Sequence, residues 1–243
     1  MKRLFIFLIS FFIFTNIASS ESRFGELTEM RDKKMRGKEG QWVRPHPGPF
    51  VWNQIENEKG KFSWEDADKN VLYAQEHNQT ILATIWPHAD WEQKSCKRKK
   101  ARSPFGKGFT KYLSKPCSME DYKTFLLKLV DRYDGDGSND MPGLTKPIKY
   151  WDIMNEPEFD MFFRGSQEDF IEIFNFSSKI IKEKQKDAVI VMAGAAGMFP
   201  ENKKYWKSVL PKIKDFNKVF LATFEKHSKF WFIHYIPMFY RFS

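Results

Sequence analysis

The sequence contains very little cysteine and no group of residues with metal-ligand spacing. Its two cysteines, Cys96 and Cys117, among 243 residues exclude a disulfide-rich miniprotein and a cysteine-based metal centre. The five histidines are scattered along the chain. A glycine-rich phosphate loop is also missing after every predicted strand, which argues against nucleotide binding. We therefore expect no metal and no cofactor.

Long apolar segments are missing beyond the N-terminus. The late apolar stretch at residues 230–242 is shorter than the roughly 20 residues that a membrane-spanning helix needs, and Pro237 interrupts it. Residues 1–20 instead have the parts of a secretory signal peptide: basic Lys2 and Arg3, an apolar run, and a small-residue cleavage site at residues 18–20. The sequence predicts a secreted or periplasmic protein with no membrane attachment once this signal is cleaved.

Export changes how the cysteines and the basic residues between them are interpreted. In an oxidising compartment we expect a Cys96–Cys117 disulfide that ties the ends of one loop, with two free thiols as the alternative. The formal net charge is +9, and the run 97–100 (Lys-Arg-Lys-Lys) with Arg102 lies inside this loop. Nucleic acid is not an expected partner of an exported protein. The cluster is then either a solvated loop or a contact for an acidic glycan or a cell surface.

The rest of the chain alternates between predicted strands and amphipathic helices. Strands are expected at residues 41–44, 81–86, 148–154 and 188–193. Helices are expected at 24–35, around 205–213, and after the capping residues Ser63, Ser118 and Ser166. This alternation is typical of βαβ units and a parallel sheet. A doubly wound fold and a (β/α)8 barrel both fit it.

The residues with the clearest chemical meaning are Asn155, Glu156 and Pro157, which directly follow the predicted strand at 148–154. In a barrel, catalytic side chains emerge at the C-terminal ends of strands. A glycosidase needs one carboxyl group as general acid, with a pKa raised by an apolar site. From the residues alone, such a glutamate is more often a helix cap or part of a surface ion pair.

The Asn-Glu-Pro triplet resembles the acid/base motif of the clan A superfamily of glycoside hydrolases, which includes β-galactosidases, cellulases, xylanases and β-xylosidases. Segments 52–68 and 86–91 are also similar to that superfamily, and the resemblance covers about residues 40–215. It implies an α/β fold of the (β/α)8 TIM-barrel type. It also implies retaining hydrolysis of β-glycosidic bonds in oligo- or polysaccharides, with a carbohydrate as substrate. The oligomeric state stays open.

The resemblance also implies roles for individual residues. Glu156 is expected to be the acid/base, and Asn155 to bind the 2-hydroxyl of the sugar. Arg44 resembles an arginine that supports the nucleophile, with a structural ion pair as the alternative. Four more residues are expected to line sugar subsites, unless they are core or satisfied polar side chains: His46, Trp86, His88 and Trp91.

The pattern breaks where the second catalytic carboxylate is expected, after the seventh strand. Only strands two to five are identified, and Glu225 is the one acidic residue after Asp215. Glu56, Asp90 and Glu92 are the other carboxylates that could face Glu156.

We therefore predict a signal peptide at 1–20, an incomplete barrel at 21–216 and an aromatic-rich tail of uncertain structure at 217–243. A chain cut short before its nucleophile is expected to be inactive alone. The alternatives are a non-catalytic secreted carbohydrate-binding remnant and a misread gene product.

Overall fold

The computed structural model describes residues 24–29, 38–101, 109–194, 200–214, 219–223 and 230–236. The expected signal peptide and Glu225 lie outside these ranges. One seven-stranded sheet forms the centre, in the order β7-β6-β5-β2-β1-β9-β8. A small antiparallel pair, β3 (Glu56–Glu58) and β4 (Lys61–Phe62), lies apart from it. Within the described ranges, no helix combines the length and apolar character needed to cross a bilayer.

The parallel part of the sheet has the strand order of a barrel. Its strands are β1 (Phe24–Glu29), β2 (Trp42–His46), β5 (Thr80–Ile85), β6 (Tyr150–Asn155) and β7 (Val189–Gly194). Consecutive strands of this series pair in parallel, from β1 with β2 to β6 with β7. A doubly wound sheet reverses its order at a switch point, whereas barrel strands follow chain order. The fold is therefore an incomplete (β/α)8 barrel.

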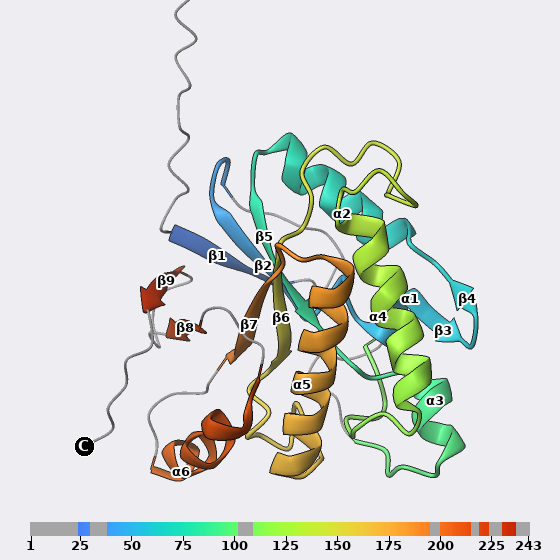
Figure 1. Ribbon diagram of the computed structural model, residues 1–243, viewed down its shortest axis with the longest axis vertical. Coiled ribbons are helices and arrows are strands. Elements are labelled where there is room, and N and C mark those ends of the chain that lie inside the picture. Colours follow the sequence, from blue (N-terminus) through green and yellow to red (C-terminus); the bar gives the residue numbers. More distant parts are fainter. Residues whose placement is uncertain are drawn as a thin grey trace, which may run out of the picture.

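An antiparallel hairpin continues the sheet beyond β1. It consists of β8 (Val219–Thr223) and β9 (Phe230–Ile236), and β9 pairs with β1. Cα atoms of β8 also approach those of β7 to within 8 Å, so the sheet curls back toward its other edge (Figure 1).

The helix expected at residues 24–35 is wrong, because residues 24–29 form the first barrel strand. Gly25 explains why this segment is a strand. Its Cα lies so close to Trp42 that an added Cβ would be 2.9 Å from the Trp42 Cβ. A glycine is unfavourable inside a helix but permits this close approach of two strands. With β1 in place, β6 is the fourth parallel strand of the barrel.

Helices cover the outer face of the sheet. Their bounds are α1 (Trp52–Ile55), α2 (Glu65–Glu76), α3 (Asp90–Ser95), α4 (Met119–Tyr133), α5 (Gln167–Lys184) and α6 (Pro200–Val209), with a 3-10 turn η1 (Leu210–Lys212). Ser118 caps α4 and Ser166 forms a capping box with Asp169, as expected. The cap expected at Ser63 is wrong: α2 begins at Glu65 without a side-chain cap, because the Ser63 N–H still bonds the Ile55 carbonyl at 2.7 Å.

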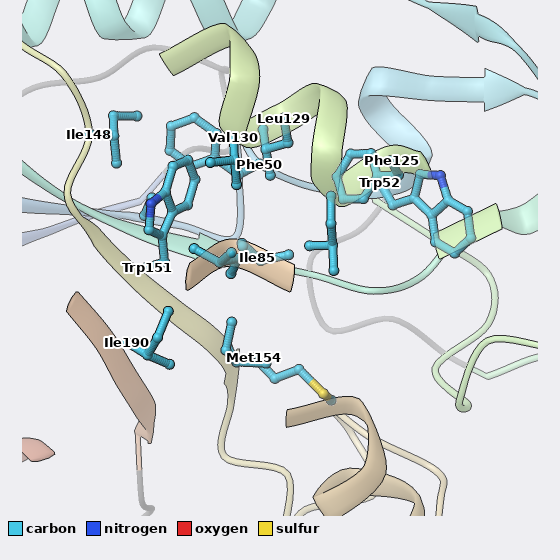
Figure 2. Packing of buried hydrophobic residues seen from close by; sticks show 14 of the residues in the cluster. Phe50, Trp52, Ile85, Phe125, Leu129, Val130, Ile148, Trp151, Met154 and Ile190 are labelled. Carbon is cyan, nitrogen blue, oxygen red and sulfur yellow. The ribbon is translucent and has the colours of Figure 1, made fainter. Parts of the chain in front are cut away.

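Alternate residues of each strand face opposite sides of the sheet. The outward residues, including Ile85, Trp151 and Ile190, pack with Val130 of α4 in the main core (Figure 2). The inward residues form layers. A lower layer of Trp42, Leu82 and Val191 is apolar. Arg44 and Thr84 follow two residues further along β2 and β5, and Asp152 is the partner of Thr84 on β6. These three inward side chains are buried and polar.

The capping box makes a testable contribution to stability. Ser166→Ala removes the hydroxyl that accepts the Asp169 N–H, so we expect the unfolding free energy to fall by about 1 kcal/mol. Ser63→Ala is the matched control because Ser63 is exposed and caps nothing, and we expect a change of less than about 0.5 kcal/mol. Urea unfolding measures both, and equal losses would contradict the capping role.

Candidate active site

A buried ion pair spans three strands directly below the candidate catalytic residue. An Arg44 terminal nitrogen donates to Asp152 Oδ2 at 2.6 Å, and Arg44 Nε donates to Thr84 Oγ1 at 3.0 Å. The Thr84 hydroxyl donates to the same carboxylate oxygen at 3.0 Å. Burial raises the pKa of Asp152 to about 6, although the Arg44 charge acts in the opposite direction. Arg44 thus lies in the barrel interior in a fixed orientation.

Glu156 follows at the C-terminal end of β6 and is half-buried. Its backbone has φ 44° and that of Met154 has φ 68°, both in the left-handed region that strains residues other than glycine. Burial, and then the Glu158 carboxylate, raise the Glu156 pKa to about 7. The Arg44 charge and a hydrogen bond with Asn155 only partly oppose this rise. Glu156 can therefore hold a proton close to neutral pH, as a general acid requires.

Glu158 is a site residue that the sequence interpretation missed. Its Oε1 accepts a hydrogen bond from Trp206 Nε1 of α6 at 3.1 Å. Its charge contributes to the raised pKa values of Glu156 and of Tyr205, also on α6. Its position two residues after Glu156 could have indicated a role in the site. Nothing in the sequence, however, indicates that α6 packs against this turn.

His46 and Trp86 lie at the same end of the sheet as Glu156. Their ring centroids are 5.8 Å apart, and Trp86 is fully buried against Phe109 and Phe162 at 5.1 and 6.1 Å. Burial, followed by the Arg44 charge, lowers the pKa of His46 to about 3. The imidazole is therefore neutral at the pH values at which Glu156 titrates.

His88 and Trp91 hold loops in place. His88 is fully buried, its Nδ1 lies 3.1 Å from the Ser114 carbonyl, and burial lowers its pKa to about 4. Trp91 Nε1 donates to the Glu56 carbonyl at 2.8 Å, and its ring packs 5.7 Å from that of Trp52. The structure thus brings Arg44, His46, Trp86, Asn155 and Glu156 to one end of the sheet, and gives His88 and Trp91 packing contacts.

The three loop carboxylates that could have opposed Glu156 are each bound elsewhere. Glu56 accepts from Trp52 Nε1 and from the Gly60 N–H, both at 2.7 Å. Asp90 Oδ1 accepts from the Thr110 hydroxyl at 2.8 Å and the Lys111 N–H at 2.7 Å. Glu92 accepts from the Ser118 N–H at 2.6 Å. These carboxylates stabilise loops.

The expected disulfide between Cys96 and Cys117 is confirmed, with Cα atoms 6.0 Å apart. Bonds to Asp90 hold the far limb of its loop, which also contributes Phe109 to the packing around Trp86. The loop is therefore attached at both ends beside the candidate site.

Three carboxylates that the sequence interpretation did not single out also lie close together. Oxygen atoms of Asp131, Asp134 and Asp136 fall within 4.8 Å of one another at the end of α4. The Lys184 ammonium already lies among them, at 2.5, 3.4 and 3.0 Å respectively. This lysine offsets part of the negative charge of the cluster, and we interpret the contacts as an ion-pair network that joins α4 to α5.

The fold is that of TIM-barrel glycosidases. No protein-family model matches the sequence, and none of the curated proteins does. A GH39 enzyme from Xanthomonas axonopodis pv. citri is similar with a TM-score of 0.58 and 12% identity, over 84% of this chain and 41% of that enzyme. A monomeric β-xylosidase from Caulobacter crescentus CB15 gives 0.58 and 13%, over 84% and 42%. A β-galactosidase from Halorubrum lacusprofundi gives 0.54 and 13%, over 84% and 40%. The chain spans about two fifths of the length of these structures.

Titration of Glu156 predicts a pH-dependent stability. Its pKa of about 7 in the folded protein exceeds the ordinary value of 4.5, so folding favours the protonated form. This stabilisation is complete below pH 4.5 and is lost as the pH rises through about 7. The unfolding free energy of the wild type, minus that of Glu156→Gln, should fall across this window in urea titrations. The contribution of Asp152 is common to both proteins and cancels, so a flat difference would contradict the raised pKa.

The influence of Glu158 on Glu156 can be measured directly. Glu158→Gln removes a like charge, so the Glu156 pKa should move down from about 7. Glu168→Gln is the matched control, because Glu168 acts on Tyr205 and is not among the charges that shift Glu156. Carbon-13 NMR titration of the glutamate carboxyl groups reports both variants. An unchanged Glu156 pKa in Glu158→Gln would show that burial alone raises it.

Proposed function

We propose that this chain carries the acid/base half of a retaining β-glycosidase, with Glu156 as the catalytic acid and base. One observation carries the proposal: a half-buried carboxyl group with a pKa near 7 follows the fourth parallel strand of a glycosidase-type barrel, beside Asn155. TIM-barrel enzymes carry their catalytic groups at this end of the sheet. The substrate proposed is an oligo- or polysaccharide with β-linkages.

The residues would act in sequence. Protonated Glu156 gives its proton to the glycosidic oxygen while a carboxylate on the opposite face attacks the anomeric carbon and displaces the leaving sugar. The resulting carboxylate of Glu156 then removes a proton from water, which hydrolyses the glycosyl-enzyme with net retention. Asn155 would hold the 2-hydroxyl of the sugar, and His46 and Trp86 would border the subsite. Arg44, anchored by Asp152, would support the attacking carboxylate electrostatically.

The carboxylate that would attack the anomeric carbon is none of the three loop carboxylates described above. Glu56, Asp90 and Glu92 are occupied by loop contacts, and Glu158 lies on the same turn as Glu156. Hence we also propose that the 243-residue chain alone does not turn over glycosides. We further propose that residues 1–20 direct export, that residues 21–216 form the barrel segment, and that residues 217–243 are an aromatic-rich tail, whose strands β8 and β9 pair as a hairpin onto β1.

The catalytic assignment is tested in two proteins: the 243-residue chain and a chimera that adds strands six to eight of the Caulobacter β-xylosidase. The chimera should hydrolyse xylo-oligosaccharides, and Glu156→Gln should slow it by roughly 10²- to 10⁴-fold. The loss should be smaller for aryl glycosides with good leaving groups, which need little protonation. Glu58→Gln, on an exposed residue of β3, is the control and should leave the rate unchanged.

Undiminished hydrolysis by the Glu156→Gln chimera would contradict the role of Glu156. Turnover by the 243-residue chain that disappears with Glu156→Gln would instead show that a second carboxylate is present within it.

A non-catalytic carbohydrate-binding protein is the second candidate. The observation that favours it is the occupation of Glu56, Asp90 and Glu92 by structural contacts. In that case the chain would bind glycans without hydrolysis, and Glu156→Gln would leave the affinity unchanged. A chain without either activity would support a misread gene product.

A further inference from the structure

The loop closed by the Cys96–Cys117 disulfide, with the end of α3 before it, carries a concentration of positive charge. We call its exposed cations the basic rim: Lys94, Lys97, Arg98, Lys99, Lys100 and Lys111. None of the six forms an ion pair with another residue of the described part of the chain. Lys59, Lys115 and Lys184, in contrast, all do. Glu92 lies near Arg98, but it is buried and bonded to the Ser118 N–H.

The basic rim lies at the same end of the sheet as Glu156. Ala101, the neighbour of Lys100, packs against the cluster of Trp86, Phe109 and Phe162. Phe159 packs against this cluster too, and its N–H donates to the Glu156 carbonyl at 3.0 Å. The rim and the turn that carries Glu156 thus share one hydrophobic support.

The described parts of the loop are held in a defined position. The Ala101 N–H bonds the Lys111 carbonyl at 2.8 Å, which joins the two limbs of the loop. Asn53 Nδ2 donates to the Phe109 carbonyl at 2.8 Å, and Asp90 accepts the Lys111 N–H at 2.7 Å. A loop that is ordered before binding loses less conformational entropy when a ligand contacts it. The backbone on both sides of the basic rim therefore meets a ligand in a defined position.

We infer that the basic rim recognises carboxylate or sulfate groups of an acidic glycan whose sugar ring enters the site at Glu156. This inference rests on the proposed function and narrows its substrate class to anionic polysaccharides. Ammonium and guanidinium groups form charge-assisted hydrogen bonds with both kinds of anion. A concentrated patch of one sign also raises the local concentration of an oppositely charged ligand, and salt screens this effect.

The experiment uses the full chain and calorimetric binding at low and high salt. The ligands are oligogalacturonate, a sulfated galactan oligosaccharide, a neutral xylo-oligosaccharide and a DNA duplex. The rim variant K97Q/R98Q/K99Q/K100Q is compared with K69Q/K179Q/K186Q/K204Q, which removes the same charge from exposed positions on or next to α2, α5 and α6. The carbon-13 signal of the Glu156 carboxyl reports whether each ligand reaches the site.

At low salt, an acidic glycan should bind about ten-fold more tightly than the neutral one, and high salt should abolish this advantage. The rim variant should lose the advantage, and the control variant should keep it. The better of the two acidic ligands identifies the anionic group. Equal losses in both variants, or DNA binding as tight as that of the glycan, would overturn the inference.

The same measurements distinguish a failure of the rim inference from a failure of the proposed function. If the neutral glycan moves the Glu156 signal but the acidic glycans have no advantage, the inference is overturned and the proposed function stands. If no glycan moves the Glu156 signal, the proposed function fails, and the inference fails with it.

Discussion

The buried ion pair of Arg44 with Asp152 is the constraint on which the candidate site depends. Burial of two charges is costly, and removal of one partner from such a pair typically destabilises a protein by about 3–5 kcal/mol. Here Thr84 shares the Asp152 oxygen, so three neighbouring strands are tied together within the barrel interior. The pair also sets the electrostatics one layer above it. Burial and the Glu158 charge outweigh the Arg44 charge and raise the Glu156 pKa to about 7.

The site is therefore assembled from elements that are distant in sequence. Arg44 belongs to β2, Glu156 follows β6, and Glu158 is bonded to Trp206 of α6. A shift of α6 would move the Glu158 charge relative to Glu156 and change the proton affinity of the candidate acid. The helix that covers the barrel after the fifth strand thus takes part in tuning the chemistry at the end of the fourth.

Sequence patterns predicted those features that local physics determines. The apolar run 81–86 and the serine caps at Ser118 and Ser166 need only neighbouring residues, and the structure has β5, α4 and α5 there. The strand β1 was missed because it is defined by its pairing with β2 and by the close approach of Gly25 to Trp42, which are long-range contacts. Glu158 was missed for the same reason: its partner Trp206 is 48 residues away.

The loop carboxylates bear on whether the described residues contain a nucleophile that could face Glu156. Glu56, Asp90 and Glu92 could each have faced Glu156, but their oxygens hold Trp52, Lys111 and Ser118 in place. Releasing Glu56 would leave the buried Trp52 Nε1–H unpaired, which costs roughly 1–3 kcal/mol. Releasing Asp90 or Glu92 would free the backbone N–H of Lys111 or Ser118, so these loops resist supplying a nucleophile. A retaining reaction requires a second carboxyl about 5 Å from the first. Glu56, Asp90 and Glu92 do not supply that group while they hold these loop contacts.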